Sequence, residues 1–349
     1  MAEASSLGSE GVGDVAGAEP DFQEHGFEFH GTASEYFRIW VVNLVLTLVT
    51  FGVYSAWAKV RTQQYLASST QLAGASFAYL ADPMAILRGR AIVVGFFLVY
   101  FTASLVSTYL EFAMSIAMVL AIPWAVVRSM SFRAHNTAWR NIRFGFRADY
   151  GPAFGAYIGY PLLGTVTLGV LYPDAIFRQR RFIVNNASYG STGFRIGSRS
   201  GQFYRLFGLV LLLVVVMSIT VGLGVGLVGE QAILGAVLIA LPFYFMMFGL
   251  IAAGISNLTY EGAQLGSHRL SSKVPAVGLA TVYASNAMAM LLSLGLLIPW
   301  ARIRVLRFRL RHMSVRAAGS LDDFVARQAD DVGGAGAELG ESFGLDLGL

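Results

Sequence analysis

Long apolar runs alternate along the chain with short polar stretches in which every second residue is aromatic or aliphatic. An apolar run of about 20 residues can cross a membrane as a helix, and period-two alternation beside turn residues is typical of short strands. The pattern therefore predicts about seven hydrophobic segments joined by short surface β-hairpins. The segments lie near residues 38–57, 88–109, 112–127, 152–175, 205–228, 231–252 and 276–300.

The same unit recurs along the chain. In each copy, a pair of apolar residues at alternate positions precedes an apolar segment, which is followed by an exit to polar sequence and a turn. The alternating pairs are Phe27/Phe29, Phe77/Tyr79, Phe144/Phe146, Phe194/Ile196 and the weaker His268/Leu270. Internal repetition indicates a fold assembled from copies of one supersecondary unit. We therefore expect an all-α polytopic membrane protein built from about five diverged repeat units.

Four segments end in a related exit motif. Trp57, Trp124 and Trp300 each stand four residues before an arginine, and Asp174 takes the place of tryptophan in the third copy. Tryptophan favours the headgroup level of a bilayer, and a nearby arginine can extend its charge to that level. We predict that the three tryptophans are interface anchors. Because guanidinium groups bind phosphate and carboxylate well, the exit arginines are candidate contacts for an anionic lipid or solute: Arg61, Arg128, Arg178 and Arg304.

Composition agrees with a membrane protein, because only 13% of the 349 residues are charged and 55% are hydrophobic, whereas soluble domains carry about a quarter charged residues. Residues 1–25 and 317–349 are rich in glycine and acidic residues, a composition typical of disorder. We therefore predict a membrane domain at 26–316, between a disordered N-terminal tail and a mostly flexible, acidic C-terminal tail. Leu321, Phe324 and Val325 allow one short helix in the latter.

Two segment lengths leave two topologies open. The first, third and fifth units place 28 to 30 positions between the alternating pair and the exit motif, and the other two place 45 to 47, enough for two crossings each. If the three short segments also cross, the 25 lysines and arginines divide 9 to 16 between the faces; if they are re-entrant, all 25 share one face. The positive-inside rule favours re-entrant segments, and seven plain helices are the alternative.

Enzyme chemistry has no signature in the sequence. The five histidines are scattered, cysteine is absent, and no phosphate-binding glycine loop is present, so we predict no enzymatic activity, no cofactor and no metal site. Polar residues inside the short segments are few: Asn43, Tyr160 and Asn286 occupy equivalent places, 14 residues before the exit position. Hydrogen bonding between helices explains them, and an intramembrane polar lining is the alternative.

Several motifs, in order, resemble the YjgN-like family of bacterial inner-membrane proteins. They are Phe29-His-Gly-Thr, Tyr36-Phe-Arg-Ile-Trp40, Trp57-Ala-Lys-Val-Arg61, Asp82-Pro83 with Arg88-Gly-Arg90, and Phe343-Gly-Leu-Asp-Leu-Gly-Leu349. The resemblance covers about residues 25–349. It implies a multi-pass protein of the bacterial inner (plasma) membrane, and it supplies no catalytic or binding residues. The basic loops and both tails are expected on the cytoplasmic side.

Two functions fit these features. Internal repeats with interrupted segments are typical of transporters, which favours a transporter or channel for a small or lipid-like anion. The arginine-rich face favours a non-transporting membrane organiser that binds anionic lipids or a cytoplasmic partner. The expected partners are therefore membrane lipids, above all anionic ones, and the sequence does not indicate a protein partner. Nucleic acid is not expected, because no nucleic-acid-binding module accompanies the basic residues.

Overall fold

The computed structural model describes residues 22–229 and 232–328. Its strands form a closed antiparallel barrel in the order β1-β10-β9-β8-β7-β6-β5-β4-β3-β2. The strands are β1 (Phe22–Phe29), β2 (Thr70–Leu72), β3 (Ala75–Tyr79), β4 (Thr137–Trp139), β5 (Ile142–Phe146), β6 (Ala187–Tyr189), β7 (Thr192–Arg195), β8 (Gln264–Leu265), β9 (His268–Ser272) and β10 (Met313–Ala318). The ring closes where β1 pairs with β10, with Phe22 opposite Ala318 and Gly26 opposite Ser314.

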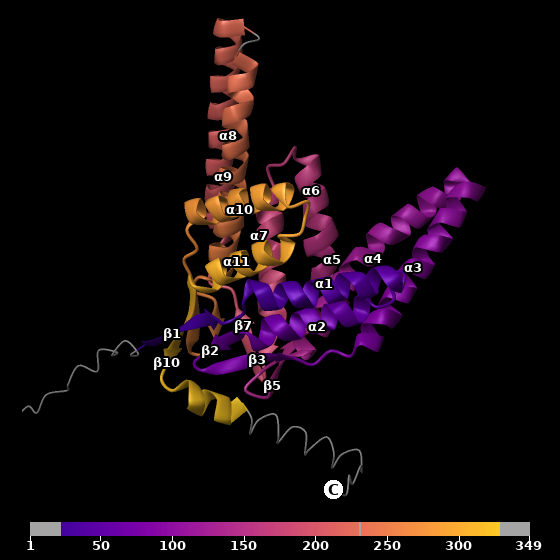
Figure 1. Ribbon diagram of the computed structural model, residues 1–349, viewed down its shortest axis with the longest axis vertical. Coiled ribbons are helices and arrows are strands. Elements are labelled where there is room, and N and C mark those ends of the chain that lie inside the picture. The colour runs from indigo at the N-terminus through magenta and orange to yellow at the C-terminus, as the bar shows by residue number, and fades with distance from the viewer. Residues whose placement is uncertain (1–21, 230–231, 329–349) are drawn as a thin grey trace, which may run out of the picture.

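A helical hairpin connects the strands of each unit to those of the next, so that five hairpins extend from the barrel (Figure 1). They are α1 (Ala33–Val49) with α2 (Ser55–Ser68); α3 (Pro83–Val106) with α4 (Thr108–His135); α5 (Tyr150–Phe154), the π-helix η1 (Gly155–Gly159) and α6 (Tyr160–Val166) with α7 (Tyr172–Asn186); α8 (Ser200–Val228) with α9 (Ala232–Tyr260); and α10 (Ala276–Leu292) with α11 (Ile298–Leu310). Neighbouring hairpins are in contact, including α11 with α1. The helices therefore form a ring that closes as the strands do.

The barrel has two different rims. All five hairpins leave from one rim, and the tight turns between β2 and β3, β4 and β5, β6 and β7, and β8 and β9 lie at the other. A short helix at 321–328 packs on this turn rim. Its Phe324 ring lies 6.2 Å from that of Tyr189 and 4.5 Å from that of His268, measured between centroids. Gln328 Oε1 accepts a hydrogen bond from the backbone N–H of Ser191 at 2.8 Å.

Aromatic side chains fill the barrel interior. The ring of Phe77 stacks on those of Phe27, Trp139 and Phe144, with centroids 6.3, 6.2 and 6.4 Å apart. The hydroxyl of Tyr189 donates to the backbone oxygen of Trp139 at 3.0 Å, and burial raises the pKa of Tyr189 to about 12. Several of these rings come from the alternating pairs of the sequence, because every second residue of a strand faces the same side of a barrel. The interior is therefore a packed core.

The predicted all-α fold with separate surface hairpins is wrong. The strands that the sequence indicated do form, but they join into one closed barrel, and β1 begins at Phe22, inside the predicted N-terminal tail. Four helices of the described residues, where about seven were predicted, are long and apolar enough to cross a membrane: Pro83–Val106, Thr108–His135, Ser200–Val228 and Pro242–Tyr260. The three short segments fall below that length because a turn divides each into shorter helices.

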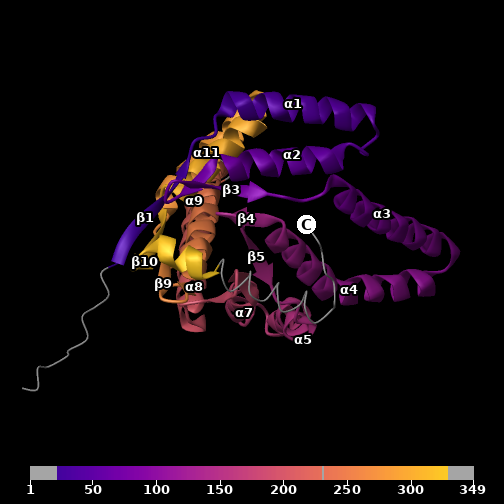
Figure 2. The ribbon, with the colours of Figure 1, turned by 90° about the horizontal axis from the view of Figure 1, so that it is seen from below.

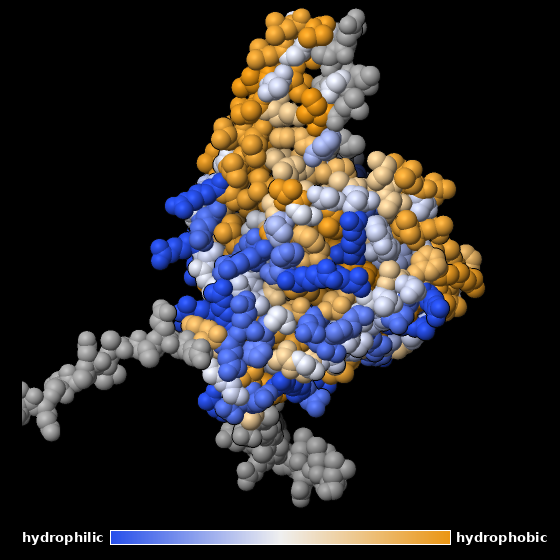
Figure 3. Space-filling view, turned by 60° about the vertical axis from the view of Figure 1, so that its left-hand side comes forward, coloured by the Kyte–Doolittle hydropathy of each residue, from blue (hydrophilic) through white to orange (hydrophobic). Residues whose placement is uncertain are grey.

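The apolar helices and the barrel occupy different parts of the molecule. The α3–α4 and α8–α9 hairpins project far beyond the barrel (Figure 1). The α1–α2 hairpin runs across the direction of α8–α9, which is seen nearly end-on from below (Figures 1 and 2). Apolar side chains cover α8–α9, and polar ones gather lower down, around the barrel (Figure 3). Outward-facing apolar helices of this length are typical of contact with lipid.

Candidate functional site

A buried asparagine joins the two helices of the hairpin in the first and fifth units. Asn43 on α1 and Asn286 on α10 are 6% and 2% exposed. Their side-chain amides donate to the backbone oxygens of Ala58 at 3.3 Å and of Ala301 at 3.1 Å. Both acceptors directly follow the exit tryptophan in the sequence. Equivalent positions in the repeat thus make equivalent contacts, and these contacts join helices.

Two exit arginines bind the facing helix of their own hairpin. The guanidinium of Arg178 lies 3.9 Å from the ring centroid of Tyr160, and its Nε donates to Oδ2 of Asp174 at 2.7 Å. Arg304 Nη1 donates to Oδ1 of Asn286 at 3.3 Å, and its guanidinium lies 5.0 Å from the ring centroid of Trp300. The salt bridge between Arg178 and Asp174 is the one that their spacing along a helix predicts. These two arginines therefore take part in holding the hairpins together.

The remaining exit residues are more open. Arg61 on α2 and Arg128 on α4 are exposed. Trp124 is 55% exposed, whereas Trp57 and Trp300 are half-buried. The four exit arginines belong to four different hairpins, and the structure does not gather them around one cavity.

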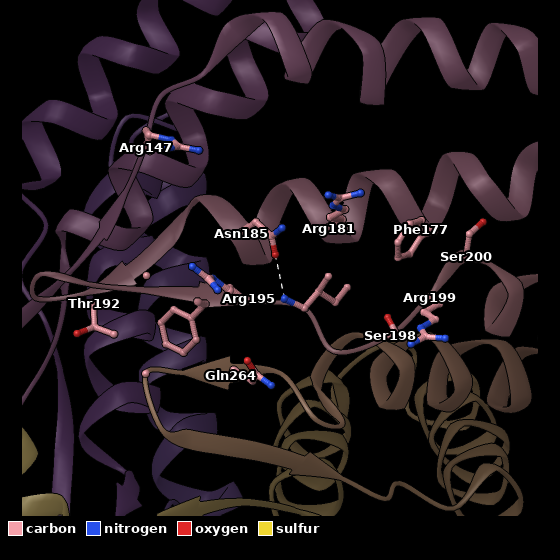
Figure 4. Close-up of a pocket in the computed structure, with 14 residues that line it drawn as sticks. Arg147, Phe177, Arg181, Asn185, Thr192, Arg195, Ser198, Arg199, Ser200 and Gln264 are labelled. Atoms are coloured by element: carbon pink, nitrogen blue, oxygen red, sulfur yellow. Dashed lines mark hydrogen bonds between the residues drawn. The ribbon is translucent and has the colours of Figure 1, made fainter.

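A cavity of about 910 Å³ contains a different set of arginines. We call it the arginine cavity, after Arg147, Arg181, Arg195 and Arg199, which line it (Figure 4). Arg147 follows β5, Arg181 is on α7, Arg195 ends β7, and Arg199 directly precedes α8. The other lining side chains include polar and apolar groups: Asn185, Ser198, Ser200, Gln264, Phe177, Phe194 and Ile196.

Hydrogen bonds from α7 hold the walls of the arginine cavity in place. Asn185 Oδ1 accepts from the backbone N–H of Ile196 at 2.9 Å, which joins α7 to the end of β7 (Figure 4). Asn186 Oδ1 accepts from Arg147 Nε at 3.3 Å. Asp174 Oδ1 accepts from Ser200 Oγ at 2.7 Å, which joins α7 to the first residue of α8. The cavity therefore lies at the rim where α8 leaves the barrel.

The arginine cavity is strongly positive. No aspartate or glutamate lines it, and none of its arginines takes part in the ion pairs of the described residues, which are His30–Glu28, Arg140–Asp322 and Arg178–Asp174. Asp174, which touches the lining residue Ser200, is already paired with Arg178. Arginine stays charged at any physiological pH. Four guanidinium groups gathered in this way favour the binding of an anion, which would accept charge-assisted hydrogen bonds from them.

The sequence alone does not identify the arginine cavity. Arg147 and Arg181 stand in basic stretches that follow exit motifs, but none of the four cavity arginines is among the predicted anion contacts. The usable signal was the alternation in β7, because Phe194 belongs to the barrel core and its neighbour Arg195 must point to the other face. A second missed feature is a hydroxyl–apolar–glycine triplet at the middle of each short segment: Thr50-Phe51-Gly52, Thr167-Leu168-Gly169 and Ser293-Leu294-Gly295.

The part of the chain that the structure describes contains no group of side chains arranged as a metal site. Within residues 22–229 and 232–328, no group of three or more His, Cys, Asp or Glu side chains is placed to hold a metal ion. The polar groups of the arginine cavity are mostly hydrogen-bond donors, which suit an anionic ligand better than a cation.

A closed barrel that carries five helical hairpins, four of whose helices are long and apolar enough to span a bilayer, defines a multi-pass membrane protein. Residues 24–342 match the family described as bacterial protein of unknown function (DUF898), and the chain belongs to this family.

Three relatives carry the name inner membrane protein YjgN. The chain is 24% identical to that of Escherichia coli O157:H7 over 155 residues, which are 44% of this chain and 39% of the relative. It is 26% identical to that of Escherichia coli strain K12 over 160 residues, 44% of this chain and 39% of the relative. It is 27% identical to that of Salmonella typhimurium strain LT2 over 155 residues, 43% of this chain and 38% of the relative. The matched part thus spans about two fifths of these relatives, and no solved structure matches the chain.

Proposed function

We propose that the protein is a non-transporting membrane organiser that binds anionic lipid headgroups in the arginine cavity. The observation that carries this proposal is the group of four arginines, without a counter-ion among the described residues, at the rim where α8 begins. Phosphate suits this group because the planar guanidinium fork donates parallel hydrogen bonds to two phosphate oxygens. Phe177 and Ile196 add apolar surface for the first carbons of the acyl chains.

Transport of a small or lipid-like anion is the second candidate function. The interrupted short segments support this function. The second of them contains the π-helix η1, and π-helices are frequent at functional sites. Two features argue against a transport path through the barrel. Its interior is packed with side chains, and the helix at 321–328 lies on its turn rim. We therefore place headgroup binding ahead of transport.

The test uses the full chain in nanodiscs of zwitterionic lipid. Short-chain phosphatidylglycerol is added in increasing amounts, and its binding is measured by the shift in the unfolding temperature of the protein. Arg181→Gln, Arg195→Gln and Arg199→Gln together should weaken binding at least tenfold, because each removed charge-assisted hydrogen bond contributes about 1.5 kcal/mol or more. The matched control replaces three arginines that are also exposed but lie outside the cavity and are not exit arginines: Arg143, Arg269 and Arg311. It makes the same change in net charge and should alter binding far less.

Two further measurements are needed. One distinguishes a lipid headgroup from free phosphate as the ligand, and the other distinguishes headgroup binding from transport. Inorganic phosphate at moderate concentration should compete weakly with the lipid, because it makes no contact with the apolar wall. Sealed vesicles that contain the protein should take up labelled phosphate, and should redistribute labelled phosphatidylglycerol between leaflets, no faster than protein-free vesicles. Equal weakening in the two triple variants would remove the arginine cavity as the site, and protein-dependent flux would favour transport instead.

A further inference from the structure

The three short hairpins share one turn. In each, an apolar residue and then a glycine adopt positive φ angles: Phe51 (48°) and Gly52 (90°), Leu168 (52°) and Gly169 (96°), Leu294 (50°) and Gly295 (88°). We call Phe51, Leu168 and Leu294 the tip residues. Each of these glycines donates its N–H to the backbone oxygen five positions earlier, at 2.8 Å in all three units. The hydroxyl that opens each triplet accepts from the N–H four positions later, at 2.9, 3.2 and 3.1 Å.

The tip residues expose large apolar side chains. Phe51, Leu168 and Leu294 are 98%, 95% and 93% exposed. A residue with a bulky side chain is rarely found at positive φ, where glycine or asparagine fits better. An apolar side chain is thus held in an unfavourable backbone conformation and left almost fully exposed by the protein, at the same place in three units. The recurrence points to an apolar surrounding that the protein itself does not supply.

The spacing between tip and exit sets how deep the hairpins can reach. Ten positions separate tip residue and exit arginine in each short unit, from Phe51 to Arg61, Leu168 to Arg178 and Leu294 to Arg304. At a rise of about 1.5 Å per residue this is about 15 Å, half of the roughly 30 Å hydrocarbon thickness of a bilayer.

The α3–α4 hairpin behaves differently. Its turn at Ser107 lies 21 positions before Arg128, which gives about 32 Å at the same rise, the length that a full crossing needs. The α1–α2 hairpin runs across the direction of α8–α9 (Figures 1 and 2). Such a tilt reduces the depth of its tip further.

We propose that the three short hairpins insert their tips into the acyl chains of the leaflet next to the barrel and turn back inside that leaflet. Only α3–α4 and α8–α9 then cross the membrane. The exit arginines of the three short units, with Trp57 and Trp300, lie at the headgroup level of the same leaflet, which is where such residues are favoured. The tips are thereby an interaction surface for lipid acyl chains, and they fix the barrel to one face of the bilayer. This inference does not depend on what the arginine cavity binds.

The chain contains no cysteine, so single labels can be placed on the full protein in sealed vesicles. Phe51→Cys, Leu168→Cys and Leu294→Cys each receive a nitroxide for measurement of collision with oxygen and with a water-soluble nickel complex. Two control sites are Ser76→Cys, exposed on β3, and Ser107→Cys, at the turn between α3 and α4. We expect the tip labels to collide mainly with oxygen and to be quenched by lipids brominated near the middle of the acyl chain. A label at Ser76 should collide mainly with the nickel complex.

A thiol reagent that cannot cross membranes supplies the second readout. We expect Ser76→Cys and Ser107→Cys to react from opposite sides of the vesicle and the three tip cysteines to react from neither. Reaction of a tip from the side of Ser107 would mean that the hairpin crosses, and reaction from the side of Ser76 would mean that the tip lies in water. Either result overturns the proposal for that hairpin. The two control cysteines define the two sides of the membrane in the same samples.

Discussion

At the scale of single residues, Asn43 and Asn286 have the same role with different surroundings. Each donates to the backbone of the facing helix. Asn286 Oδ1 in turn accepts from Arg304 Nη1 at 3.3 Å, whereas Asn43 Oδ1 is buried without a hydrogen-bond partner among the described residues. A buried polar atom without a partner costs free energy that a paired one does not. Asn286 should therefore contribute more to stability than Asn43.

We expect Asn286→Leu to lower the free energy of unfolding by about 1–3 kcal/mol, the usual cost of leaving buried hydrogen-bond partners unpaired. Asn43→Leu should cost less, because it also removes the unpaired oxygen. Unfolding of the two variants in detergent, followed by circular dichroism as denaturant is added, measures the difference. Equal losses, or a larger loss for Asn43→Leu, would contradict this account of the two hairpins.

His268 is an unusual histidine of the barrel. It is 1% exposed, its ring meets that of Phe324 edge-on, and neither of its ring nitrogens has a hydrogen-bond partner among the described residues. Burial lowers its pKa, and the charge of Arg327 lowers it further. The neutral ring is therefore the form that the folded barrel accommodates.

This predicts a loss of stability in acid. The unfolded chain, where histidine has its ordinary pKa of about 6.5, binds the proton more readily than the folded one, so the free energy of unfolding rises with pH in this range. Stability from this residue is complete above about pH 6.5 and declines as the pH falls toward the lowered pKa of the folded state. His268→Phe keeps an aromatic ring against Phe324 and cannot bind a proton, so unfolding temperatures at pH 5.5 and 7.5 should differ less in this variant. An unchanged difference would show that other groups cause the acid sensitivity.

At the scale of elements, local pattern identified the strands but not their partners. Phe27 and Phe29 lie in β1, and Phe77 and Tyr79 in β3, as their alternation predicts. The pairing of β1 with β10 joins the two ends of the described chain, and no short window of sequence contains both strands. Strands of two to eight residues also carry little information about register, which long-range packing decides. Separate hairpins were therefore predicted where a closed barrel forms.

Short windows of sequence are also the reason why only part of the candidate site could be predicted. The exit motif and the equivalent places of Asn43 and Asn286 could be aligned by counting along the chain, because each contact lies inside one hairpin. Arg147 directly follows β5 and Arg195 ends β7, and these two strands are neighbours only through β6. The two arginines lie close together only because the barrel pairs β5 and β7 with β6. Without knowledge of this pairing, the sequence could not place them in one cavity.

At the scale of the whole molecule, the topology inferred from the tips places different numbers of helices in the two leaflets. All five hairpins enter the leaflet beside the barrel, and only α3–α4 and α8–α9 continue into the other. The cross-section of the protein is then larger on the barrel side. Insertion into one leaflet expands that leaflet and is sensitive to curvature, so the protein should favour membranes in which the barrel lies on the convex face.

We therefore expect molecules with an outward-facing barrel to reach a higher density per unit area on small vesicles than on large ones. An impermeant dye on Ser76→Cys counts only the outward-facing molecules, and single-vesicle fluorescence gives density against diameter. Phe51→Asp, Leu168→Asp and Leu294→Asp together are the control, because a carboxylate is costly in hydrocarbon and should keep the tips out of the leaflet. The triple variant retains the four long apolar helices and should distribute evenly over vesicle sizes. A density that is independent of diameter for the unaltered tips, or equally enriched in the triple variant, would show that the short hairpins do not act as a wedge.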